Sequence, residues 1–146
     1  MSAPQSHGRA LVRSMAFLEF SSVGTLNANQ TQHMGPGGME TPPASATDAR
    51  YRLAVPCKRA GLLSGLRVYC GVAPTSDFVV VFAVIVNGAA TGITCTLRAG
   101  ERTTSDLANT AEIAPGDLVS LRTVTTNTAG VSPSFIHASL CVDEVP

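Results

Sequence analysis

The chain is poor in charge. Only 14% of its 146 residues are Asp, Glu, Lys or Arg, against a usual share of about a quarter. Ten basic and ten acidic residues give a net charge of zero, so neither nucleic acid nor a membrane surface is expected as a partner. A sparsely charged surface suits a protein that packs against neighbours.

Long apolar runs and tryptophan are also missing. No run reaches the ~18–20 residues that a membrane-spanning helix needs, and the start lacks the apolar core and cleavage site of a signal peptide. We therefore expect a soluble protein made in a reducing cytoplasm. The absence of Trp removes the buried Trp of antibody-type domains.

The usual sequence signatures of catalysis and metal binding are absent too. The four cysteines, at positions 57, 70, 95 and 141, and the three histidines, at 7, 33 and 137, show no metal-ligand or redox spacing. No phosphate loop or nucleophile elbow occurs. We predict no catalytic, cofactor-binding or metal-binding residues. Paired carboxylates contributed by distant loops, as in a glycosidase, are not excluded by sequence spacing. Cys70 and Cys95 alternate with apolar residues and are expected in the core. The spacing of the cysteines neither predicts nor excludes a disulfide.

The strongest positive feature is the apolar run Phe78–Val86, FVVVFAVIV, followed by Asn87-Gly88. Its β-branched and aromatic residues predict a strand whose two faces are both apolar. One face of an antiparallel sheet normally meets water. Val79, Val81 and Ile85 on the second face are therefore predicted to be covered, either by another copy of the chain or by the segment 24–50.

A series of short strands separated by turn residues makes up most of the chain. The expected strands are listed here by residue range: 15–23, 51–55, 66–72, 78–86, 93–98, a weak one near 110–113, 118–125 and 135–142. Residues 102–109 offer at most a turn or two of helix. This spacing predicts an all-β, antiparallel jelly-roll β-sandwich, with an immunoglobulin-like sandwich as the rival.

The domain organisation follows from the same strands. Residues 1–14 are read as an N-terminal arm and residues 15–146 as one jelly-roll domain. Within that domain, residues 24–50 form a long irregular loop, because Gly35-Pro36-Gly37-Gly38 and Pro42-Pro43 break regular structure.

Isolated polar and aromatic residues are given structural roles. Asp77, Asp106 and Asp117 lie beside turn residues, where side-chain hydrogen bonds to backbone explain them without catalysis. His137 shares a strand face with Phe135 and Cys141 and is read as a packed or interface residue. Most aromatic residues fall in strands and are expected to be buried, which weakens a sugar-binding reading.

Three motifs in order carry a family resemblance. They are AGLLSGLRV at 60–68, FAVIVNGAATGITCTL at 82–97 and APGDLVSLR at 114–122. Together they resemble the C1q/TNF-like jelly-roll modules of bacteriophage and other virus structural proteins. Such modules usually form trimers and serve as capsid decoration (cement) proteins, head fibres or tail-fibre tips.

The resemblance implies a function without enzymatic activity. We expect a virion structural protein, foremost a capsid decoration protein that stabilises a phage shell as a homotrimer. Its partners would be the major capsid protein or other virion proteins, contacted through Arg9 and Arg13 in the N-terminal arm. The alternative is a receptor- or carbohydrate-binding tip of a tail fibre or spike. Nothing in the residues favours a third reading, a hydrolase on a β-sandwich.

Overall fold

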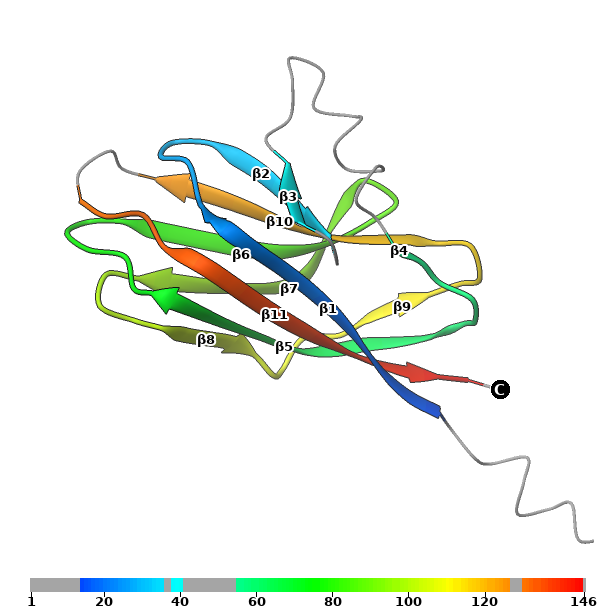
Figure 1. Cartoon of the computed structure of the whole chain (residues 1–146). Helices are drawn as coiled ribbons and strands as arrows, with labels where there is room; N and C mark the ends of the chain where they lie inside the picture. The colour runs from blue at the N-terminus through cyan, green and yellow to red at the C-terminus, as the bar shows by residue number, and fades with distance from the viewer. Residues whose placement is uncertain (1–13, 36–37, 41–54, 127–129, 146) are drawn as a thin grey trace, which may run out of the picture.

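The fold consists of two antiparallel β-sheets packed face to face (Figure 1). The structure is a computed structural model that describes residues 14–35, 38–40, 55–126 and 130–145. Sheet A runs in the order β1 (Ser14–Thr25), β11 (Ser134–Glu144), β5 (Gly61–Val72), β8 (Thr103–Asp106), with β9 (Ala111–Ile113) also on β5. Sheet B runs in the order β3 (Gly38–Glu40), β2 (Thr31–Gly35), β10 (Leu118–Thr126), β6 (Val79–Val86), β7 (Ala89–Arg98), with β4 (Val55–Pro56) on β10.

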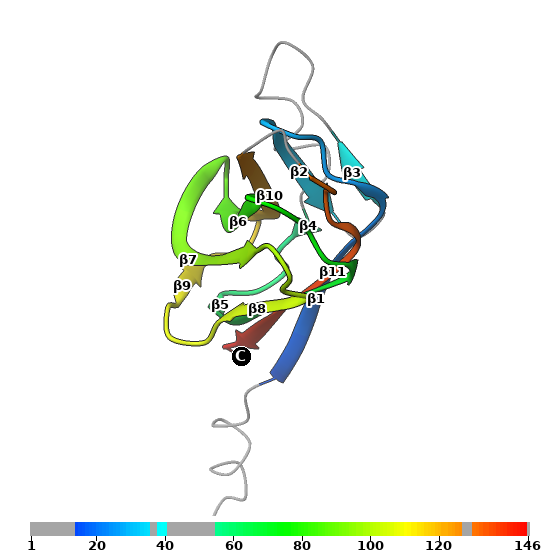
Figure 2. The same cartoon turned by 90° about the vertical axis from the view of Figure 1, so that its left-hand side faces the viewer.

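The pairing of the eight main strands defines a jelly roll. The first pairs with the last, β1 with β11, and the pairs β2–β10, β5–β8 and β6–β7 nest inside it. This nesting is that of one long antiparallel ribbon wound over two sheets. Figure 2 shows the sandwich from its end, with β6 and β10 in one layer and β5 and β11 in the other. The predicted fold class is confirmed.

The core lies between the two sheets. Strand β6 supplies Val80, Phe82 and Val84, all fully buried, and β1 supplies Phe20 from the opposite sheet. Cys70 and Cys95 are buried free thiols in the same cluster, as predicted. Strand β6 is paired on both sides, with β10 and with β7, so it is a central strand whose backbone groups are satisfied by two neighbours.

The turn after β6 is fixed by its own residues. Asn87 and Gly88 have φ values of 51° and 79°, the left-handed pair that a two-residue hairpin requires. The Asn87 side chain also reaches the turn before β10, where its Nδ2 donates to Asp117 Oδ1 at 2.9 Å and its Oδ1 accepts from the Leu118 N–H at 2.9 Å. Asp117 Oδ2 accepts from the Ala114 N–H at 2.8 Å, which is the side-chain bond to turn backbone predicted for it.

Two stretches differ from the sequence prediction. Strands β2 and β3 lie within the segment 24–50, which was expected to be irregular. The buried residues Gln32, His33 and Met34 of β2 pair with β10, so tertiary pairing overrides a local sequence rich in turn residues. Strand β8 replaces the possible helical turn at 102–109, because Thr103–Asp106 completes the edge of sheet A against β5.

Strand β5 begins earlier than predicted. The sequence predicts its start at residue 66, whereas the strand begins at Gly61, which pairs with Glu144 of β11. A Cβ at position 61 would lie 2.7 Å from the Asp143 carbonyl oxygen, so glycine allows this close approach. Gly65, with φ of 64°, lies beside the register shift between Ser139 and Cys141.

No helix in the described ranges is long and apolar enough to cross a membrane.

Candidate functional site: the outer face of sheet A

The outer face of sheet A carries half of the exposed large apolar side chains of the described residues. On β1 and β11, Met15, Phe17 and Phe135 are 67%, 65% and 57% exposed, and on β5 Tyr69 is 48% exposed. Their neighbours along each strand, such as Phe20 and Ile136, point into the core. The alternation of a strand therefore displays these side chains on rigid backbone rather than on loops.

Polar side chains occupy the middle of this face in two cross-strand rows. The first row is listed in sheet order: Ser21, His137, Tyr69 and Thr103. The second row is Glu19, Ser139, Arg67 and Ser105. Directly opposed residues of antiparallel strands lie on the same face, so both rows face outward. We call the two rows together with Met15, Phe17, Phe135 and Cys141 the outer face.

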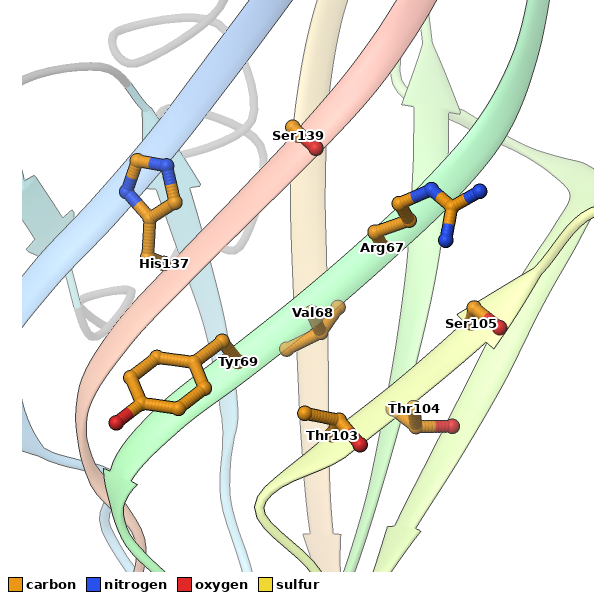
Figure 3. A pocket seen from close by; sticks show the side chains of 8 residues that line it. All are labelled: Arg67, Val68, Tyr69, Thr103, Thr104, Ser105, His137 and Ser139. Atoms are coloured by element: carbon orange, nitrogen blue, oxygen red, sulfur yellow. The ribbon is translucent and has the colours of Figure 1, made fainter.

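A shallow groove of about 490 Å³ runs over the middle of the outer face. The lining side chains on this face come from β11, β5 and β8 (Figure 3): His137, Ser139, Arg67, Tyr69, Thr103 and Ser105. Glu19 borders the groove, with its Oε1 3.9 Å from His137 Nε2. The groove thus combines a cation, an aromatic ring, an imidazole and hydroxyl groups.

Phe135 is held in an unusual backbone conformation. Its φ is 54°, a region that bulky residues rarely adopt. Gly71 lies across from it, and a Cβ at position 71 would approach the Phe135 Cβ to 3.0 Å. The glycine leaves room for the aromatic side chain, which is the way aromatic residues compensate for glycines in neighbouring strands. The ring nevertheless stays more than half exposed.

Three of the four cysteine thiols are poor nucleophiles. Burial raises the pKa of Cys95 to about 12. Burial, followed by the nearby Asp117 and Glu144 charges, raises the pKa of Cys57, and burial also raises that of Cys70. These three thiols stay protonated at neutral pH, whereas a reactive cysteine needs a lowered pKa.

Metal chemistry finds no support in the described ranges either. There, no three His, Cys, Asp or Glu side chains gather closely enough to hold a metal ion. A second hollow, of about 190 Å³, opens near Cys57, Ile113 and Val142 at one end of the sandwich. Its lining combines apolar residues of the core with Lys58, Arg59 and Glu144. The exposed aromatic side chains lie on sheet A instead, so the outer face remains the candidate site.

Comparison with known proteins finds matches among solved structures alone. No protein-family model matches the chain, and no curated protein matches it. Among solved structures, the globular domain of a zebrafish complement 1qA protein matches with 10% sequence identity and a TM-score of 0.48, over 92% of this chain and 98% of that chain. The nested strand pairing by itself establishes the jelly roll.

The predicted interface residues lie on the other sheet. Val79 and Val81 are half-buried on the outward side of β6, while Ile85 is only 1% exposed within the single chain. Ile85 is therefore already covered and offers little surface to a second copy. An interface role for these residues stays a prediction. Arg9 and Arg13 lie outside the described residues, and their contact with a capsid also stays a prediction.

The sequence reading missed the exposed aromatic residues. It expected most aromatics to be buried, which is right for Phe20, Phe78 and Phe82 and wrong for Phe17, Tyr69 and Phe135. The signal was present on β5, where Arg67 and Tyr69 occupy the opposite phase to the buried Leu66, Val68 and Cys70. The sequence did not show that β1, β11, β5 and β8 are neighbours in one sheet. That order places their outward side chains on one face.

Proposed function

We propose that the chain is a non-enzymatic structural protein of a virion, a capsid decoration protein that works as a homotrimer. The observation that carries the proposal is the set of large apolar side chains on the outer face. Large apolar side chains gathered on one face of a small protein suit an interaction site. Here Met15 and Phe17 lie on one side of the two polar rows and Phe135 lies on the other. Met, aromatic residues and Arg are the types enriched at interfaces, whereas Lys is depleted, and the outer face has Met15, Phe17, Tyr69, Phe135 and Arg67 but no Lys.

The energetics support association through this face. Fully covering one large apolar side chain is worth about 1.5–3 kcal/mol, so four of them contribute several kcal/mol against the entropic cost of association. The resemblance of the sequence to virus jelly-roll modules favours three copies in a closed ring. In the particle, the segment that precedes β1, with Arg9 and Arg13, would contact the major capsid protein.

Two measurements test this function. Native mass spectrometry of the purified chain should give three times the 15.1 kDa chain mass. Quantitative mass spectrometry of purified particles should give a copy number comparable to that of the major capsid protein, and shells that lack the protein should break at lower temperature. A monomeric chain that is absent from particles would overturn the proposal.

One specific observation, the groove on the outer face, favours the alternative function of a receptor- or carbohydrate-binding tip. Tyr69 offers an aromatic platform, and Arg67 with the hydroxyls of Thr103, Ser105 and Ser139 offers hydrogen-bond donors and acceptors to a sugar. This alternative predicts binding on a glycan array that Tyr69→Ala abolishes, together with only a few copies in each particle.

A further inference from the structure

The second polar row of the outer face carries opposite charges at separate places. Glu19 lies on β1 and Arg67 on β5, with Ser139 of β11 between them. Neighbouring strands are ~4.8 Å apart, so two intervals place these residues about 10 Å apart along the row. Among the described residues the structure gives no ion pair between Glu19 and Arg67, and the Glu19 carboxylate lies 3.9 Å from His137 Nε2 instead.

Both charges are available to a partner. The Glu19 side chain is 66% exposed, and the structure gives it one ion-pair neighbour among the described residues, His137 at 3.9 Å. Arg67 is exposed beside Ser139 and Ser105 in the same row. Its planar guanidinium has donors arranged to match a carboxylate.

We propose that Glu19 of one copy forms an ion pair with Arg67 of the next copy when the chain self-associates through the outer face. The inference rests on the proposed homotrimer and names its register. In a ring of copies whose strands run along the symmetry axis, one side of each face meets the other side of the next. The β1 side carries the acid and the β5–β8 side carries the base, so the two sides are complementary.

The surroundings of the two charges strengthen the pairing. Phe17 lies one step along β1 from Glu19 on the same face, and Tyr69 lies one step along β5 from Arg67. Covering these rings excludes water from the charges, which raises the strength of their attraction. An opposite-charge pair in such a place also fixes the register of association, because a shifted register would leave both charges unpaired.

The test uses the charge reversals Glu19→Arg and Arg67→Glu in the full chain. Each variant alone places like charges together and should weaken self-association about tenfold or more, measured by analytical ultracentrifugation at low ionic strength. The double variant should recover the association of the wild type. Arg98→Glu, at the end of β7 on the other sheet, is the matched control and should leave association unchanged.

Mixing the two single variants decides whether the pair forms between copies. A mixture restores opposite charges only across an interface, so native mass spectrometry should show mixed assemblies in excess over pure ones. Single variants that associate like the wild type, or a mixture with no excess of mixed assemblies, would overturn the pairing and leave the trimer standing. A wild-type chain that is monomeric, including one that instead binds glycans through the groove, would overturn the proposed function itself.

Discussion

At the scale of the residue, Asp106 is the most heavily bonded carboxylate of the described chain. Its Oδ2 accepts hydrogen bonds from the Thr94 N–H and Asn109 Nδ2, both at 2.9 Å, and its Oδ1 accepts from the Ala108 and Asn109 N–H groups, both at 3.1 Å. Burial raises the pKa of this carboxyl, but the four hydrogen bonds outweigh it and lower the pKa from 3.8 to about 2. The charged carboxylate thereby ties the end of β8 to β7 and to the following turn.

We therefore predict that Asp106→Asn lowers the free energy of unfolding by about 2 kcal/mol at neutral pH, since it replaces an acceptor of four bonds with a group that is partly a donor. Because the folded pKa is depressed, the contribution is fully present above about pH 4 and is lost as the pH falls toward 2. Urea denaturation of both proteins at pH 7 and pH 3, at one fixed protein concentration, measures this. Asp77→Asn, at an exposed position, is the control, and a difference that does not shrink at pH 3 would contradict the assignment.

At the scale of the element, the outward side of β6 contributes more to the fold than to an exposed surface. Ala83 and Ile85 on this side are 2% and 1% exposed in a single chain, between cross-strand partners on β10 and β7. We expect Ile85→Ala to lower the free energy of unfolding by about 2–4 kcal/mol, the range for deleting a buried aliphatic side chain. Val81→Thr, at a half-buried position of the same face, should cost about 1 kcal/mol or less, as surface substitutions do.

Chemical denaturation at several protein concentrations checks this prediction. An effect that belongs to the fold of one chain keeps the same size at every concentration, whereas an effect on an interface shifts the unfolding midpoint with concentration. If Ile85→Ala changed only the concentration dependence, the predicted interface on this face would be correct after all.

Elements with a strong local pattern were predictable, and those that depend on distant partners were not. The runs 15–23, 78–86 and 118–125 alternate or are uniformly apolar, and each is a strand. Strand β8 has the sequence Thr-Thr-Ser-Asp, which contains no apolar residues whose alternation could indicate a strand. It is a strand because it pairs with β5 along the edge opposite to β11, and the local sequence does not reveal this partner.

The candidate site shows the same division. Alternation along the last strand predicts Phe135 and His137 on a common face, which is confirmed, and the same alternation places Phe17 with Glu19 on β1. It did not bring these two faces together, because their pairing joins residues more than a hundred positions apart. Local alternation says which residues share a side of a strand, but only the sheet order says which strands share a surface.

At the scale of the whole molecule, the jelly roll gives its two sheets different surroundings. Sheet B buries Ala83 and Ile85 on the outward side of its central strand β6. Sheet A leaves Met15, Phe17 and Phe135 more than half exposed. A molecule that exposes large aromatic and Met side chains on the outward side of one sheet is suited to associate through that sheet, since covering them removes apolar area from water.

The outer face should therefore control the oligomeric state. We predict that Phe17→Ser shifts the chain from trimer to monomer at micromolar concentration, because it removes an aromatic side chain whose burial is worth about 1.5–3 kcal/mol at each interface. Val131→Ser is the matched control, since Val131 is also about half exposed, at 52%, but lies in the loop before β11. Light scattering coupled to size-exclusion chromatography measures the mass, and thermal denaturation checks that both variants fold. Equal masses for the two folded variants would place the interface elsewhere on the molecule.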